Sequence, residues 1–124
     1  MVTIERFEDV EAWQLARTLN RTLYQLTTKG PFARDFGLRD QLRRAAVSVM
    51  SCIAEGFEHG SDKEFKRYLT IAKASAGEVR SLLYVADDLG YIDGVTANEL
   101  RSKTEDISRL IAAFIRYLEA SNRQ

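Results

Sequence analysis

The sequence predicts an all-α protein, an antiparallel up-down-up-down four-helix bundle that forms one domain over residues 1–124. Three observations support this prediction. Four stretches place apolar residues three and four positions apart, which is the spacing of one helical face. Glycine, proline and capping residues separate these stretches, and none alternates with the period of two that is typical of a strand. A chain of 124 residues also has the usual length of a single domain.

The first helix is expected over residues 10–28. Its apolar face consists of Ala12, Ala16, Leu19, Leu23 and Leu26. We expect Asp9 to cap this helix and Phe7 to pack against its first turn. A glycine and the only proline of the chain, at positions 30 and 31, then end the helix, because glycine adopts the left-handed cap conformation and proline cannot continue a helix. Phe32 and Phe36 are expected to fold back over the end of the bundle.

The second helix is expected over residues 38–57, in a central position. Two neighbouring apolar stripes run along it. The first stripe consists of Leu38, Leu42, Ala45, Val49 and Ile53, and the second of Ala46, Met50, Ala54 and Phe57. Alanine on both stripes allows neighbouring backbones to approach closely, so we expect this helix to contact more than one neighbour.

Two capping boxes mark the starts of the last two helices. Ser61-Asp-Lys-Glu64 precedes a helix expected over residues 62–89, and Thr96-Ala-Asn-Glu99 precedes a helix expected over residues 97–121. Both helices carry apolar residues outside their main stripes. Either a monomer exposes these residues or a homo-oligomer buries them, and we favour the homo-oligomer.

The balanced charge means that the protein as a whole has no strong electrostatic attraction to nucleic acid or membranes. We expect a cytoplasmic protein without a membrane partner. The 18 Lys and Arg residues equal the 18 Asp and Glu residues, so any nucleic-acid binding must come from a local patch. We find neither a signal-peptide pattern nor an apolar run of about 18 residues. The single cysteine, Cys52, lies in an apolar helical pattern, which favours a buried reduced thiol.

One edge of the second helix is polar. Arg44, Ser48, Ser51 and Glu55 fall within a narrow arc, because successive residues of an α-helix advance by about 100°. One interpretation is a solvated helix edge with ordinary hydrogen bonds. The other is a polar network between helices or subunits that fixes their register, with Arg44 and Glu55 at its ends.

A basic ridge is expected on the third helix, where three cations repeat every seven residues: Lys66, Lys73 and Arg80. This spacing suits contacts with successive phosphates. Surface ion pairing is the alternative, and the net charge of zero favours it. Arg39 and Arg43, at the start of the second helix, are further candidates for nucleic-acid contact. They would otherwise pair with a carboxylate such as Asp35 or Asp9.

The residue pattern gives little support for catalysis, a metal or a cofactor. His59 is the only histidine, and no Glu-x-x-His pair is present, which disfavours a di-iron bundle. Cys52 has no cation on its own face to stabilise a thiolate, and metal-ligand spacings are absent. The chain also lacks a glycine-rich phosphate loop. We therefore predict a protein that is not an enzyme and holds no metal or cofactor.

Six segments combine into a more specific pattern: Phe7-Glu-Asp-Val-Glu-Ala-Trp-Gln14, Phe36-Gly-Leu38, Gln41-Leu-Arg-Arg-Ala-Ala-Val-Ser48, Ile53-Ala-Glu-Gly56, Lys63-Glu-Phe65 and Leu89-Gly-Tyr-Ile92. Together they resemble the four-helix-bundle family encoded in intervening sequences of bacterial 23S rRNA genes. The resemblance covers nearly the whole chain. The sequence departs from the family at Met50 and Cys52, where proline and asparagine are common.

The resemblance implies a cytosolic bundle that assembles as a homopentamer and has no established enzymatic activity. Relatives of the family include the accessory variability determinant of diversity-generating retroelements, a basic pentameric barrel that binds nucleic acid and a reverse transcriptase. Our first hypothesis is therefore a non-enzymatic oligomeric scaffold associated with RNA or a ribonucleoprotein. The alternative is a protein–protein interaction module that binds no nucleic acid. A small-molecule or catalytic bundle is a third hypothesis, and it requires a deep polar pocket.

Overall fold

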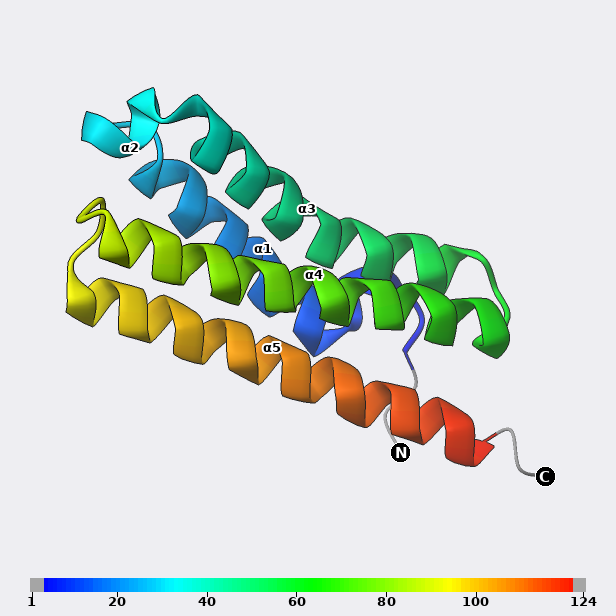
Figure 1. The fold of residues 1–124 in the computed structure, drawn as a ribbon. Coiled ribbons are helices and arrows are strands. Elements are labelled where there is room, and N and C mark those ends of the chain that lie inside the picture. Colours follow the sequence, from blue (N-terminus) through cyan, green and yellow to red (C-terminus); the bar gives the residue numbers. More distant parts are fainter. Residues whose placement is uncertain (1–3, 122–124) are drawn as a thin grey trace.

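The computed structural model describes residues 4–121, and no strand lies within that range. It contains the short 3-10 helix η1 (Phe7–Asp9) and five α-helices: α1 (Glu11–Leu26), α2 (Gly30–Arg34), α3 (Phe36–Glu58), α4 (Asp62–Asp88) and α5 (Gly94–Ser121). Figure 1 shows the four long helices gathered into one bundle, with the short α2 at one end. The prediction of an all-α bundle is confirmed, and the up-down-up-down order stays a prediction.

Each long helix packs against two others, which closes the bundle. Helix α3 lies against α1 and α4, and α5 lies against α4 and α1. The centre is filled by large side chains that are at most 1% exposed: Leu23, Leu42, Ile53, Leu69, Leu83, Ile107 and Ile111. The first apolar stripe predicted for residues 38–57 is buried along its whole length. This burial stabilises the fold by about 25 cal/mol for each Å² of apolar surface removed from water.

Helices α3 and α4 approach each other closely at Gly56. A Cβ atom at this position would lie 2.6 Å from the Tyr68 Cβ atom and 3.1 Å from the Phe65 Cδ1 atom. Real Cβ atoms essentially never come within 3.0 Å of another heavy atom, so this crossing requires a residue without a side chain. Gly56 is therefore a packing residue inside α3.

Side-chain caps set the starts of three helices. Asp35 accepts a hydrogen bond from the Leu38 amide at 3.2 Å, and Ser61 accepts one from the Glu64 amide at 3.2 Å, as its capping box predicts. Helix α5 is capped by Asp93, whose carboxylate accepts from the Thr96 amide at 2.8 Å.

The predicted starts of three helices need correction. Helix α5 begins at Gly94 rather than residue 97, because the cap is Asp93 and the Thr96 hydroxyl donates to it at 2.9 Å. Helix α3 begins two residues before position 38, since its cap is Asp35. Asp9 lies in η1 and does not cap α1, which starts after Val10 without a side-chain cap.

The end of the bundle nearest α2 is closed by an aromatic pair. Phe32 is 2% exposed, and its ring stacks on Tyr91 with the ring centroids 5.2 Å apart. The Tyr91 hydroxyl donates to Asp35 at 3.0 Å, and this bond raises the pKa of the tyrosine. The expected lid is thus formed by Phe32. Phe36 is 62% exposed, with the Arg39 guanidinium 4.8 Å from its ring centroid.

The connections between the last three helices are short. Residues 59–61 join α3 to α4, and residues 89–93 join α4 to α5. None of the helices described between residues 4 and 121 combines the length and apolar character that a membrane crossing needs.

Candidate nucleic-acid interface

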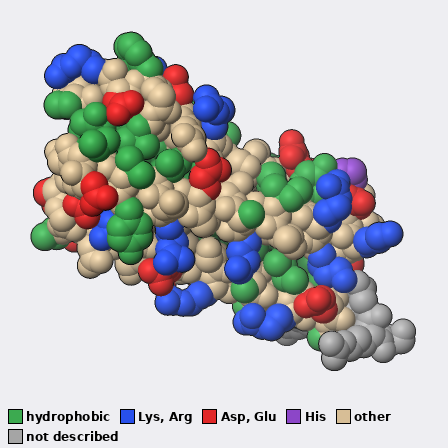
Figure 2. Space-filling view, in the orientation of Figure 1, with side chains coloured by type: hydrophobic (Ala, Val, Ile, Leu, Met, Phe, Trp, Pro, Cys, Tyr) green, Lys and Arg blue, Asp and Glu red, His purple; other side chains and the backbone are tan. Residues whose placement is uncertain are grey.

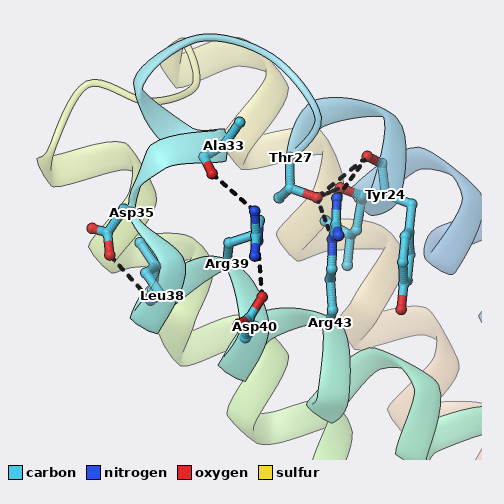
Figure 3. Close-up of polar contacts among 9 residues, drawn as sticks. Tyr24, Thr27, Ala33, Asp35, Leu38, Arg39, Asp40 and Arg43 are labelled. Carbon is cyan, nitrogen blue, oxygen red and sulfur yellow. Dashed lines mark hydrogen bonds and ion pairs between the residues drawn. The ribbon is translucent and has the colours of Figure 1, made fainter.

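Arg39 makes its contacts at the end of the bundle where α2 lies (Figure 3). Its guanidinium donates to Asp40 at 2.8 Å and to the Ala33 carbonyl oxygen at 3.0 Å, and only 24% of its side chain is exposed. The guanidinium also lowers the pKa of Asp40. The carboxylate beside Arg39 is therefore that of Asp40, and the arginine ties α2 to the first turn of α3.

Arg43 links α3 to the carboxyl end of α1 (Figure 3). Its Nε atom donates to the Thr27 hydroxyl at 2.8 Å, and a terminal nitrogen lies 3.5 Å from the Tyr24 carbonyl oxygen. The guanidinium stands 4.3 Å from the centroid of the Tyr24 ring. A cation is favourable at this position, because the last carbonyl groups of a helix carry partial negative charge. Both arginines thus make contacts within the protein.

The basic ridge of Lys66, Lys73 and Arg80 runs along the edge of α4 that borders α5. Lys73 is exposed and Lys66 is half-buried, and neither side chain has a hydrogen-bond or ion-pair partner among residues 4–121. Arg80 lies 3.7 Å from a carboxylate oxygen of Glu105 on α5. Figure 2 shows Lys and Arg side chains gathered over this part of α4 and α5. The ridge thus combines two unpaired lysines with one arginine that faces a carboxylate.

A groove of about 200 Å³ lies where the ridge meets α5. Its lining comprises Lys73, Arg80, Glu105, Ser108, Arg109 and Ala112. Arg109 donates to Glu105 and to Asp106, each at 3.2 Å. The Arg80 Nε atom is buried without a hydrogen-bond partner in the described part of the chain. Reasoning from the sequence missed Ser108 and Arg109, because the only signal that could find them is the packing of α4 against α5.

The polar edge of α3 forms hydrogen bonds to α4 at its centre. The Ser48 hydroxyl lies 2.9 Å from the Ser75 hydroxyl and 3.6 Å from the buried Cys52 sulfur. Two turns earlier, Gln41 donates to Glu78 at 3.1 Å. Ser75, Glu78 and Gln41 were not among the sequence candidates, since the neighbouring helix decides which polar residues meet.

The two residues at the ends of the polar edge face solvent. Arg44 and Glu55 are exposed and have no hydrogen-bond or ion-pair partner within residues 4–121. Arg44 stands between two shallow grooves, one bordered by Tyr24 on α1 and one by Ser75 on α4. The proposed ends of a polar network therefore do not meet inside one chain, and a partner for them would have to come from outside it.

Between residues 4 and 121, no group of three or more His, Cys, Asp or Glu side chains is placed to hold a metal ion. His59 stacks on Tyr68 with ring centroids 5.2 Å apart.

A further groove of about 480 Å³, open to solvent, lies where the start of α1 meets α5. It is mainly apolar, with Val10, Leu110 and Phe114 in its lining.

Two comparisons with known proteins agree with this architecture. Residues 8–113 match the family model of the 23S rRNA-intervening sequence proteins. A crystal structure from Bacteroides thetaiotaomicron, of a protein of unknown function from the S23 ribosomal protein family, superposes with a TM-score of 0.78. The two chains are 18% identical, and the match covers 85% of this chain and 95% of the other. That identity supports a shared fold only. A comparison with curated proteins found no match.

Proposed function

Because the chain belongs to the family of 23S rRNA-intervening sequence proteins, we propose that it is a non-enzymatic, RNA-associated scaffold that works as a homo-oligomer. Neither the family nor the structural relative, whose function is unknown, indicates a catalytic activity. The proposed RNA contact is the ridge of Lys66, Lys73 and Arg80.

The observation that carries this proposal is the pair of lysines on the ridge without a partner. A lysine that already pairs with a carboxylate gains little by moving to a phosphate, whereas an unpaired lysine releases a counterion when it binds RNA. Lys66 and Lys73 lie two helical turns apart on one edge of α4, and no acidic partner is bonded to either within the described residues. Arg39 and Arg43 are weaker candidates, because both guanidinium groups already have partners.

Exposed apolar side chains on α3, on α4 and directly after α4 support a homo-oligomer, and the family resemblance favours a pentamer. Val47, Ile71, Val85 and Leu89 are 39–53% exposed, and Arg44 and Glu55 lie on α3 without partners. A second copy would cover apolar surface of this kind and supply partners for the open ends of the polar edge. Assembly would also repeat the ridge, so that several weak phosphate contacts act together on one RNA.

Filter binding to 23S rRNA fragments over a series of salt concentrations tests the RNA contact. Replacing both Lys66 and Lys73 by glutamate should weaken binding and lower the slope of log K against log salt by about two for each copy engaged. The matched control reverses two exposed cations away from the ridge, Arg21 and Lys29. Absence of binding at low salt, or an equal loss in the control, would refute the proposal.

The open apolar groove at the start of α1 favours a second candidate function, a protein–protein interaction module. Its lining by Val10, Leu110 and Phe114 suits an apolar side chain of a partner better than a nucleic acid. In this case charge reversal on the ridge leaves partner capture unchanged, whereas Leu110→Glu abolishes it. Light scattering gives the oligomeric state for both candidates, and a stable monomer would remove the argument from a repeated ridge.

A further inference from the structure

We infer that the groove between α4 and α5 is a built site for one phosphodiester group, held by Lys73 and Arg80 from α4 and by Ser108 from α5, with Arg109 adding positive charge beside them. This inference rests on the proposed RNA contact and makes it specific. The ridge alone would give a diffuse electrostatic attraction. A groove with donors from two helices would instead hold a phosphate at one place.

Arg80 is the first indication of a ligand. Its side chain is 40% exposed and borders the groove, and it makes no hydrogen bond within the described residues. The Nε atom itself is buried, so a ligand in the groove would meet the terminal nitrogens of the guanidinium. The terminal nitrogen of the same guanidinium lies 3.7 Å from Glu105, which is too long for a good hydrogen bond. Arg80 therefore has donor capacity that the chain itself does not use.

The remaining lining residues supply further donors around the same space. The Ser108 hydroxyl and the Lys73 ammonium group have no hydrogen-bond partner in the described part of the chain, and both border the groove. The guanidinium of Arg109 is oriented by Glu105 and Asp106 at 3.2 Å each. An oxyanion would satisfy the donors of Lys73, Arg80 and Ser108 together, and arginine is suited to phosphate because its planar fork binds two oxygens at once.

Charge and size favour a phosphodiester over other anions. Three cations (Lys73, Arg80 and Arg109) and two carboxylates (Glu105 and Asp106) leave one net positive charge around the groove. This charge balances a phosphodiester, which carries one negative charge, better than a phosphate monoester, which carries between about 1.5 and 2 at neutral pH. A volume of about 200 Å³ accommodates the phosphate and leaves the attached sugars and bases outside the groove. The site thus suits an RNA backbone and reads no base.

Charge-conserving variants test the site, with a short ribo-oligonucleotide as the probe. Arg80→Lys keeps the charge and removes the two terminal nitrogens that fork around a phosphate, so it should weaken binding about tenfold, and Ser108→Ala about threefold. Arg116→Lys and Ser102→Ala are matched controls on α5 outside the groove lining, and they should bind as the parent protein does. NMR should show the Arg80 Nε–H signal moving when the oligonucleotide is added, and moving less with inorganic phosphate.

The possible results separate this inference from the proposed function. If charge reversal at Lys66 and Lys73 removes RNA binding while Arg80→Lys and Ser108→Ala leave it unchanged, the RNA contact stands and the built site is wrong. If the oligonucleotide does not bind at all, the proposed function fails. The Arg80 signal with inorganic phosphate then decides the site separately, because a movement supports it and no movement overturns it.

Discussion

Replacement of Gly56 by alanine should destabilise the protein, although alanine favours helices more than glycine does. In an open helix interior the change stabilises by about 0.8–1 kcal/mol. At Gly56 the new methyl group would lie 2.6 Å from the Tyr68 Cβ atom. That neighbour is attached directly to the α4 backbone, so a rotamer change cannot relieve the contact. The two helices must move apart, and overpacking of this kind costs about 1–3 kcal/mol.

The expected net effect of Gly56→Ala is a loss of stability of up to about 2 kcal/mol, since a packing cost of about 1–3 kcal/mol opposes a gain in helix propensity of about 0.8–1 kcal/mol. Urea denaturation followed by circular dichroism measures this loss. Gly77→Ala is the matched control, because Gly77 lies inside α4 and a Cβ atom there would have no neighbour within 4 Å. The control should gain about 0.5–1 kcal/mol. If both variants gain stability equally, the close approach of α3 and α4 at Gly56 is not a constraint and our reasoning is wrong.

Three further predictions concern the helix ends. The Thr96 contacts hold the pKa of Asp93 below its ordinary value, so the contribution of this cap is present at neutral pH and lost as the pH falls through the folded-state pKa. Asp93→Asn should flatten the acid limb of a urea-midpoint titration, and an unchanged limb would contradict the cap. The bond to Asp35 raises the pKa of Tyr91, so its contribution is present below the ordinary tyrosine pKa and lost as the pH rises through the folded-state pKa. Tyr91→Phe should therefore lower stability at neutral pH and reduce the alkaline loss that the parent protein shows in the same titration. Arg43→Met should cost about 1–2 kcal/mol, because it removes the bond to Thr27 and the contact at the end of α1; thermal melting measures this loss, and an unchanged melting temperature would count against the link.

The long helices could be predicted from the sequence because their signal is local. An apolar residue every three or four positions requires no knowledge of the neighbouring helix, and the main stripe of α3 is buried as expected. Helix ends were less predictable. Asp93 and Thr96 are both good capping residues, and the choice depends on where the chain turns into α5, which local propensity does not determine.

Only the α4 residues of the candidate site could be predicted from the sequence. Lys66, Lys73 and Arg80 follow from heptad spacing within α4, whereas Ser108 and Arg109 belong to it because α5 packs beside that edge. The arginines of α3 illustrate the same limit. The partners of Arg39 include a backbone carbonyl of α2, and Arg43 reaches the end of α1. Such contacts depend on tertiary packing that a single sequence does not show.

The short connections on either side of α4 have a consequence for how the chain folds. Helix α4 contacts both α3 and α5, and only a few linking residues separate it from each, so little loop entropy opposes their association. We expect these three helices to form the folding nucleus and α1 to dock afterwards. Mutations at the α3–α4 crossing should then slow refolding, whereas loss of the Arg43 link to α1 should mainly accelerate unfolding. Helix α1 would then be the last helix to dock during folding and the first to detach during unfolding.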